Sequence, residues 1–379
     1  MGRKTIERGI SYDDVKKCYY VLLSTGTDAN GQSTKRYETV RTIKEARAIR
    51  KEHKKQVVQG RVLPASGDTL AERSEQYIQY KSMQLQATTI YGYNNIVKNH
   101  IKPYFKKKKI QDIKVKDLRA YIVFKNKAGL SSTTIRRHLD LLNSIFDAAK
   151  KERVIMENPL DFMDAVVSDT KEKEFYTPEE TAVLLNSLKD SQIRVAVYLA
   201  VCLGLRRGEV VGLRWEDVDL ENGVIYIKNT RTQAGSQVIE KDPKTESGHR
   251  KMAIVQPLYD VLRQEKERQP VKRSMAEKTV HSGYVVTMRD GKPMRPNYLS
   301  DLFGKHVRKH KLKKITFHDL RHTYATIAAH EGASIQEIST SLGHAGIGVT
   351  ASVYTHRFDE VKIVATEKVA ASFSHLLEE

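Results

Sequence analysis

The stretch Gly204-Leu-Arg-Arg-Gly-Glu209 decides the fold, because the chain passes there from its longest apolar run directly onto two adjacent arginines. The apolar run extends from Val195 to Leu205 and is far shorter than the roughly 20 residues that cross a bilayer. It therefore predicts a buried helix in a globular domain rather than a membrane span. We expect this helix to lead straight into a site that carries positive charge.

Three further polar patterns follow along the chain. The first is a predicted turn between two strands, at residues 223–228 and 250–255, and the second begins a predicted helix on which positions 318 and 321 share one face. Together with the first stretch they predict one site built from Arg, Lys, His and Tyr. The patterns are Pro243-Lys244-Thr-Glu-Ser-Gly-His-Arg250, His318-Asp-Leu-Arg321-His-Thr-Tyr324, and Leu342-Gly-His344-Ala-Gly followed by Val353-Tyr354-Thr-His-Arg357.

These side chains indicate phosphoryl transfer without a metal ion. The sequence has no glycine-rich phosphate loop, no His-Glu-x-x-His pattern and no cluster of carboxylates spaced for magnesium, which a nuclease or polymerase normally needs. Arg, Lys and His can instead stabilise a pentacoordinate phosphate by charge, and a tyrosine can attack it. We therefore expect no cofactor and no metal, and an activity that withstands EDTA.

The composition favours a polyanionic partner. The chain has 379 residues with 65 Lys and Arg against 46 Asp and Glu, a net charge of +19. A surplus of this size favours nucleic acid over an acidic membrane surface, and it is densest in the first 65 residues. The N-terminus has no apolar signal stretch and the two cysteines are far apart, so we expect a cytoplasmic, nucleoid-associated protein without disulfides.

The length exceeds what one hydrophobic core serves, so we expect a multidomain, mainly α protein with small β elements. Residues 1–62 predict a three-stranded sheet followed by a helix from Ile43 to Gln59. Two interpretations of this segment stay open. The sheet is a half-buried support for a solvated basic helix, or it enters a groove of DNA. Residues 66–165 predict a helical bundle, and residues 172–379 predict a mixed, mainly α domain with a β insertion.

Capping and breaking residues give the expected bounds of the helices. A Thr followed three residues later by Glu is a capping box, and it occurs at Thr42 and at Thr177-Pro-Glu-Glu180. Pro103 is expected to close the second helix of the bundle. A last amphipathic helix, Val361 to Leu377, is expected to pack on its own core or to dock on a neighbouring protomer. The bundle helices are expected at 69–85, 88–101, 114–127 and 131–151, with a linker at 60–67 and a charged hinge at 171–175.

In residue types, order and spacing, the four patterns resemble the tyrosine recombinase (phage integrase) family, over essentially the whole chain. The subgroup most similar is that of integrases from conjugative transposons and temperate phages. The resemblance implies an arm-type DNA-binding domain at 1–62, a core-binding DNA domain at 66–165 and a catalytic domain at 172–379. It implies a site-specific DNA recombinase that cuts and rejoins strands through a 3′-phosphotyrosine, integrating and excising a mobile element.

The resemblance also implies roles for the polar residues. Arg206 and Arg321 match the catalytic arginines, and a guanidinium suits that role because it forks two hydrogen bonds onto phosphate and stays charged. His318 and His344 match the catalytic histidines, which donate to the remaining oxygens or handle the tyrosine proton. Glu209 occupies the acidic position after the first arginine and would support its turn.

Two implied residues carry the bond changes. Lys244 matches a lysine on a mobile hairpin that protonates the departing 5′ oxygen, and Tyr354 matches the nucleophile. Each assignment has rivals nearby. Arg207 adjoins the first catalytic arginine, and Lys241 and Lys251 flank the hairpin lysine. The remaining nearby histidines, His322 and His356, are not expected to be catalytic, although His356 could approach the site.

Two alternative functions stay open at this point. A type IB topoisomerase shares the chemistry but relaxes DNA as a monomer, and a catalytically silent DNA-binding regulator would keep site binding and form no covalent adduct. The favoured hypothesis predicts double-stranded DNA as partner and a homo-tetramer in the synaptic complex. The N-terminal segment reads either a separate arm site or the same recombination site as the rest of the chain. An excisionase or a host DNA-bending protein is a further candidate partner, and no membrane is expected.

Overall fold

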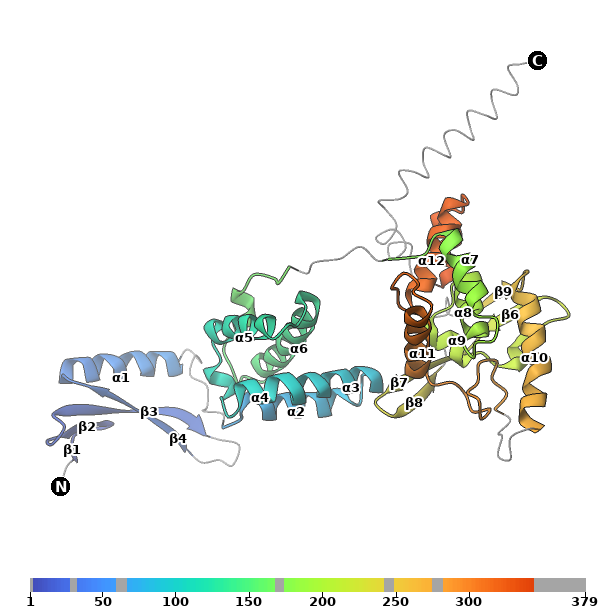
Figure 1. Cartoon of the computed structure of the whole chain (residues 1–379). Helices are drawn as coiled ribbons and strands as arrows, with labels where there is room; N and C mark the ends of the chain where they lie inside the picture. The colour runs from blue at the N-terminus through green and yellow to red at the C-terminus, as the bar shows by residue number, and fades with distance from the viewer. Residues whose placement is uncertain are drawn as a thin grey trace, which may run out of the picture. The chain divides into compact units, whose positions relative to one another are not determined.

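The chain divides into two compact units, Met1–Thr170 and Lys171–Glu379 (Figure 1). The computed structural model describes residues 3–27, 33–58, 67–167, 174–241, 249–274 and 282–343. The linker expected at 60–67 and the hinge expected at 171–175 lie largely outside these residues, and the tail helix expected at 361–377 lies wholly outside them. No described helix is long and apolar enough to cross a membrane.

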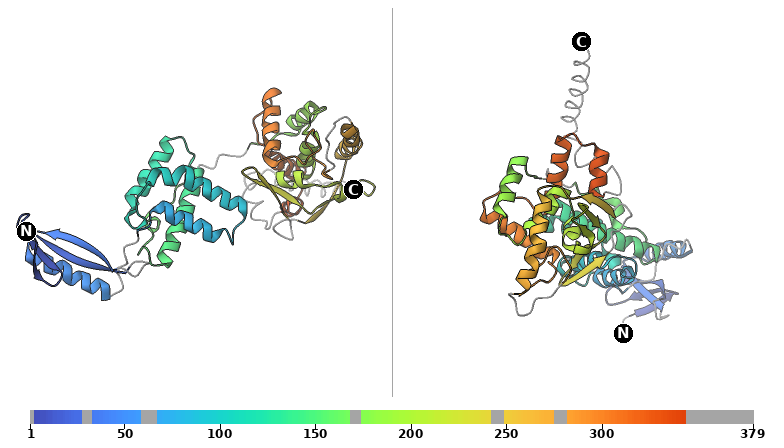
Figure 2. Two further views of the ribbon diagram at one scale, coloured as in Figure 1. Left: turned by 90° about the horizontal axis from the view of Figure 1, so that it is seen from below. Right: turned by 90° about the vertical axis from the view of Figure 1, so that its right-hand side faces the viewer.

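The first unit begins with a four-stranded antiparallel sheet in the order β1-β2-β3-β4, with α1 packed on one face (Figures 1 and 2). This is one strand more than the three expected, because a tight turn at Gly9, with φ of 81°, returns the chain and pairs β1 with β2. Strand alternation places Ile10 and Val21 in a small core with Ala46 of the helix. The bounds are β1 Arg3–Glu7, β2 Ile10–Asp13, β3 Cys18–Thr27, β4 Ser33–Val40 and α1 Ile43–Val58.

The helical bundle that follows is built around α6, an amphipathic helix. Its buried face carries Leu142, Ile145 and Phe146, and α5 adds the buried ring of Tyr121. The helical bundle of the expected fold class is therefore present, and its longer helices begin within one residue of the expected starts. The bounds are α2 Leu70–Lys81, α3 Ala87–Ile96, η1 Val97–Ile101, α4 Lys102–Phe105, η2 Ile110–Asp112, α5 Val115–Lys127, α6 Ser132–Lys151 and η3 Pro159–Phe162.

The expectation that Pro103 closes the second bundle helix is wrong. Helical structure continues past it as α4, which ends at Phe105. The intervening η1 is a π-helix, and the N–H of Lys102 still donates to the carbonyl of Val97. Pro103 is the second residue of α4 and follows this π-helical turn directly, so the helical path continues past a residue that has no N–H.

Capping residues start helices where the sequence predicts. Thr42 Oγ1 accepts from the N–H of Glu45 at 3.2 Å, and the Glu45 carboxylate accepts from the N–H of Thr42 at 3.3 Å. Thr177 and Glu180 form the same pair of bonds at 3.2 and 2.9 Å, so α7 begins at the expected proline. Each box satisfies backbone donors that the first turn of a helix leaves without an intrahelical partner.

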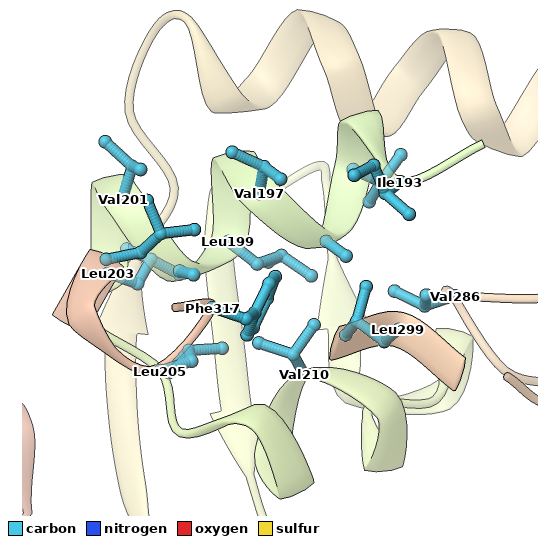
Figure 3. Close-up of a cluster of buried hydrophobic side chains, with 14 of the residues drawn as sticks. Ile193, Val197, Leu199, Val201, Leu203, Leu205, Val210, Val286, Leu299 and Phe317 are labelled. Atoms are coloured by element: carbon cyan, nitrogen blue, oxygen red, sulfur yellow. The ribbon is translucent and has the colours of Figure 1, made fainter. Parts of the chain in front are cut away.

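The second unit is organised around α8, the helix expected from the long apolar run. Figure 3 shows Val197 and Leu199 of this helix lying above Phe317 and Val210, with Leu299 beside them. The cluster is buried throughout, so it fixes the segments that flank the polar patterns. The helices are α7 Pro178–Ser187, α8 Arg194–Leu203, α9 Arg207–Gly212, η4 Trp215–Asp217, α10 Leu258–Ser274, α11 Pro296–Lys309, α12 Asp319–His330 and α13 Ile335–Leu342.

The β insertion contains the expected strand pair and one additional hairpin. β6 and β9 pair antiparallel, with Tyr226 opposite Lys251, and β5 extends this sheet. A separate hairpin of β7 and β8 lies between them in the sequence, closed at Gly235, whose φ is 61°. The strands are β5 Val218–Asp219, β6 Val224–Ile227, β7 Thr230–Ala234, β8 Gln237–Lys241 and β9 Arg250–Ala253.

Candidate active site

Arg206 lies at the turn between α8 and α9. Gly204 ends α8 in the left-handed region, with φ of 61°, and a Cβ there would come within 2.6 Å of the Tyr324 ring. Glycine therefore allows the turn to lie this close to α12. The turn directs the arginine so that Nη1 donates to Glu209 at 2.8 Å and Nη2 donates to the carbonyl of Gly343 at 2.7 Å.

Arg321 lies in the first turn of α12 and is only 3% exposed. The start of this helix is held in the core by Phe317, whose ring packs edge-on against Phe303. Arg321 Nη1 donates to the carbonyl of Gly204 at 2.9 Å, and Nη2 donates to the carbonyl of Leu342 at 2.7 Å. Both carbonyls stand at helix C-termini, where the backbone dipoles concentrate negative charge that stabilises a buried cation.

The two arginines meet at the end of α13. They donate to the carbonyls of consecutive residues, Leu342 and Gly343, at 2.7 Å each. Consecutive Cα atoms are about 3.8 Å apart, so the two guanidiniums are neighbours. The next residue in the sequence is His344. The structure thus brings two of the sequence-predicted residues together directly before a third.

His318 immediately precedes α12 and is exposed. Its ring packs edge-on against that of His322, with the ring centres 5.4 Å apart. The carbonyl of His318 also accepts from the N–H of Arg321 at 3.1 Å, so the expected pair lies on a single helical turn. The exposed imidazole and the buried guanidinium therefore occupy the same end of α12.

Glu209 places a buried carboxylate beside Arg206 in this site. Its Oε2 accepts from the backbone N–H of Arg206 and from Nη2 of Arg250, both at 2.9 Å. Burial raises the pKa of this carboxyl, but the hydrogen bonds and charges of Arg250 and Arg206 outweigh burial and hold the pKa below its ordinary value. The carboxylate is therefore ionised at neutral pH. Within the described ranges, no group of three or more His, Cys, Asp or Glu residues could hold a metal ion.

The rival residues make other contacts. Arg207 Nη1 donates to the Ser300 hydroxyl of α11 at 2.8 Å, so this arginine is directed toward α11. Lys241 ends β8, opposite Thr230. Lys251 lies exposed on β9, with Nζ 6.0 Å from the centre of the Tyr226 ring.

Three of the expected catalytic residues lie outside the described residues, namely Lys244, His344 and Tyr354, and so does His356. Described elements nevertheless lie next to Lys244 and His344 in the chain. Lys244 follows β8 and precedes β9, and His344 follows α13. Of the expected set, Arg206 and Arg321 meet at the end of α13, and His318 lies on the same helical turn as Arg321, at the start of α12.

Arg250 is a residue of this site to which the sequence analysis assigned no role. It is the first residue of β9, and it donates to Glu209 through Nη2 at 2.9 Å and through Nη1 at 3.3 Å. A signal was present, because Arg250 ends the Pro243–Arg250 pattern. The sequence could predict a strand start there, but not which carboxylate the guanidinium would reach.

Comparison with protein families identifies the chain. Residues 174–360 match the model of the phage integrase family, and residues 69–125 match that of the phage integrase N-terminal SAM-like domain. The chain belongs to the phage integrase family. It is therefore a tyrosine recombinase, a site-specific DNA recombinase, and the family and enzyme class expected from the sequence are confirmed.

Two relatives illustrate where this tyrosine recombinase stands within the family. It is 28% identical over 373 residues to a tyrosine recombinase XerC-like protein of Caldanaerobacter subterraneus subsp. tengcongensis, across 93% of this chain and 95% of the relative. It is 27% identical over 266 residues to the ICEBs1 integrase of Bacillus subtilis, across 69% of this chain and 72% of the relative. The recombinase is thus related to integrases of conjugative elements.

Solved structures confirm the fold class. The Tn1549 transposon integrase in complex with a circular intermediate DNA matches with a TM-score of 0.68 and 24% identity, across 79% of this chain and 99% of that chain. A lambda integrase tetramer bound to a Holliday junction matches with a TM-score of 0.59 and 17% identity, across 90% of this chain and 97% of that chain. Both share the mainly α architecture with small antiparallel sheets.

Proposed function

We propose that this recombinase is the integrase of a mobile element and that it breaks and rejoins double-stranded DNA at Tyr354. One observation carries the proposal, namely the convergence of Arg206 and Arg321 on consecutive carbonyls at the end of α13. Two neighbouring guanidiniums suit a single phosphate, because each can fork two hydrogen bonds onto its oxygens. The names of the Bacillus and Tn1549 relatives support a mobile element as the DNA that this recombinase integrates and excises.

The proposed reaction exchanges one phosphate ester for another. Tyr354 Oη attacks the scissile phosphorus, the bond from phosphorus to the 5′ oxygen breaks, and a 3′-phosphotyrosine remains. His318 or His344 takes the tyrosine proton, and Lys244 donates a proton to the departing 5′ oxygen. A 5′-hydroxyl of a partner strand then reverses the step. Because each ester bond is replaced by another, the sequence of steps needs no external energy source.

The surroundings of the two arginines support their part in this step. Arg321 is held by the C-terminal ends of two helices, and Arg206 is held by Glu209 and Gly343, so both are oriented before DNA binds. Charged donors that are fixed in advance stabilise a transition state without reorganisation at the moment of reaction. His318 is exposed beside them, where it can reach a phosphate oxygen. Arg207 is directed toward α11, which favours Arg206 as the first catalytic arginine.

We also propose a division of labour among three domains, with arm-site binding at 1–62, core-site binding at 66–165 and catalysis at 172–379. Separate hydrophobic clusters support the first two domains, one around Val21 and one around Phe146. Exposed lysines suit contacts to DNA phosphates on both. They include Lys51, Lys54 and Lys55 on α1, and Lys106, Lys107 and Lys109 in the loop after α4.

The proposed assembly is a homo-tetramer on two DNA duplexes, because exchange of two duplexes breaks four strands and each protomer supplies one tyrosine. The lambda integrase tetramer on a Holliday junction is an assembly of this kind on a similar fold. An excisionase or a host DNA-bending protein would bias the direction of the reaction. The tail at 361–377 is the proposed contact between protomers, and its deletion should abolish cooperative synapsis.

A nicked suicide substrate tests the function directly. The wild-type chain should form a covalent DNA–protein band, and Tyr354→Phe should form none because it lacks the attacking oxygen. Tyr259→Phe, on α10, is the matched control and should form the band like the wild type. A band that persists in Tyr354→Phe would refute the assignment of the nucleophile. Strand exchange between two duplexes, measured on the same protein, separates a recombinase from a topoisomerase.

A further inference from the structure

The carboxylate of Glu209 is shared between two arginines from different parts of the domain. Oε1 accepts from Arg206 Nη1 at 2.8 Å and from Arg250 Nη1 at 3.3 Å. Oε2 accepts from the Arg206 backbone N–H and from Arg250 Nη2, both at 2.9 Å. Each oxygen therefore binds one donor of each arginine, and the acid lies between the two guanidiniums.

From this arrangement we propose that Arg250 is a positioning residue for the phosphate clamp. It engages Glu209 so that the acid orients Arg206 without cancelling the positive charge that Arg206 offers to DNA. The inference rests on the proposed function, because it assigns a role within the same site. Arg250 itself contacts Glu209 and acts on the scissile phosphate through it.

The charge balance supports this role. One carboxylate between two guanidiniums leaves a net charge of +1, whereas one carboxylate with Arg206 alone leaves none. The exposed fractions of the Glu209 and Arg250 side chains are only 4% and 9%, so water and salt screen this pair poorly. The loss of a charge here therefore changes the potential at Arg206 more than the loss of a surface charge would.

The place of Arg250 in the chain supports the role as well. It is the first residue of β9, opposite Ile227 of β6, whose side chain is buried in the core. In the sequence it follows Lys244 by six positions and ends the same polar pattern. The ion pair therefore joins the strand that follows the Lys244 segment to the carboxylate that holds Arg206.

A titration signature distinguishes this role from simple packing. The described charged groups that contact Glu209 are Arg206, at the N-cap of its own helix, and Arg250, on β9. Their hydrogen bonds and charges outweigh the effect of burial and keep the pKa of Glu209 low. Without Arg250 that pKa rises, and the carboxyl takes up a proton at a higher pH. A protonated Glu209 orients Arg206 poorly, so the acid limb of the activity profile moves to higher pH.

The test measures single-turnover formation of the covalent adduct on a suicide substrate as a function of pH. Arg250→Met should lower the rate at neutral pH by about tenfold or more, change the DNA dissociation constant by less than about threefold, and shift the acid limb upward. Arg250→Lys should recover part of the rate and of the shift. Arg250→Met combined with Glu209→Gln should abolish the shift, because no carboxyl remains to titrate.

Arg231→Met is the matched control for lost packing. Arg231 is also a buried arginine of the β insertion, but its Nη1 donates to the carbonyls of Val211 and Met294. Its replacement should leave the acid limb in place. An acid limb that does not move in folded Arg250→Met, or that moves equally in Arg231→Met, would overturn the inference. If the wild type itself forms no Tyr354-dependent adduct, the proposed function fails instead.

Discussion

At the residue scale, the site depends on what each guanidinium contacts. Arg206 is held by a carboxylate and a carbonyl, and Arg321 by two carbonyls from helix ends. The residue types and spacings of the motifs could be read from the sequence, because the chemistry of phosphate requires them. The hydrogen-bond partners of the arginines could not be predicted from the sequence. Gly204 and Leu342 approach Arg321 only after α8, α12 and α13 have packed together.

Arg321→Lys tests the need for a forked donor. An ammonium is a point charge and cannot reach two helix-end carbonyls while it also binds phosphate through two bonds. We expect the rate of covalent adduct formation to fall about 10²-fold or more in single-turnover assays. Arg263→Lys, on the exposed side of α10, should keep the wild-type rate. A wild-type rate in Arg321→Lys would show that charge alone suffices at this position.

At the scale of elements, close contacts between helices decide the geometry of the site. The end of α8 meets α12 and α13 at Gly204, where a side chain has no room. The helices themselves were predictable, because capping boxes and apolar periodicity are local signals. The β7–β8 hairpin was not predicted, although its Gly235-Ser236 turn is a usable signal. Helix α4 was missed because a π-helical turn accommodates Pro103.

Gly204→Ala should destabilise the second unit. A left-handed φ disfavours a Cβ, and that atom would also come within 2.6 Å of Tyr324 and 2.7 Å of Leu342. The expected loss in free energy of unfolding is about 2–4 kcal/mol. Gly304→Ala, on α11 and with only an ordinary contact nearby, is the control and should be neutral or slightly stabilising. Denaturation followed by the fluorescence of Trp215, the single tryptophan, measures both.

The contact between α5 and α6 should make the bundle sensitive to acid. The Tyr121 hydroxyl lies 2.9 Å from Nδ1 of His138, and burial, aided by the charges of His100 and Lys125, lowers the pKa of His138 to about 4. The unfolded chain binds this proton near its ordinary pKa, so stability is full at neutral pH and falls as the pH drops toward 4. We expect a loss of roughly 2 kcal/mol between pH 7 and pH 5 from this group.

Urea unfolding monitored by far-UV circular dichroism at several pH values checks this dependence. His138→Gln has no imidazole to titrate, so it should lose the part of the pH dependence that His138 contributes. Its stability at pH 7 should also be lower than that of the wild type. An unchanged dependence in the variant would assign the acid sensitivity to other groups.

At the scale of the whole molecule, we expect the positive charge to serve DNA affinity more than catalysis. The proposed catalytic arginines are few, whereas the surplus of +19 is spread along the chain and is densest before residue 66. Lysines on exposed positions of α1 suit contacts to phosphates, which release counterions when DNA binds. Binding should therefore weaken steeply with salt, while the chemical step should depend on the arginines at the end of α13.

Neutralising Lys51, Lys54 and Lys55 to Gln tests this separation. If all three lysines contact phosphates, the slope of log K against log salt should fall by about 2–3. The rate of covalent adduct formation at saturating DNA should stay at the wild-type value, because α1 carries none of the proposed catalytic residues. A slope equal to that of the wild type would exclude α1 as a phosphate-binding surface.

The sequence by itself determined the family, the order of the segments and the types of residue in the site, because motif spacing and helix periodicity are local properties of a chain. It also determined the starts of several helices, among them α1 and α7, through side chains that cap their own helices. Only the tertiary structure decided that Arg206 and Arg321 meet at consecutive carbonyls and that Arg250 shares Glu209. These contacts join residues far apart in the sequence, and they form only when burial of apolar side chains brings α8, α12, α13 and β9 together.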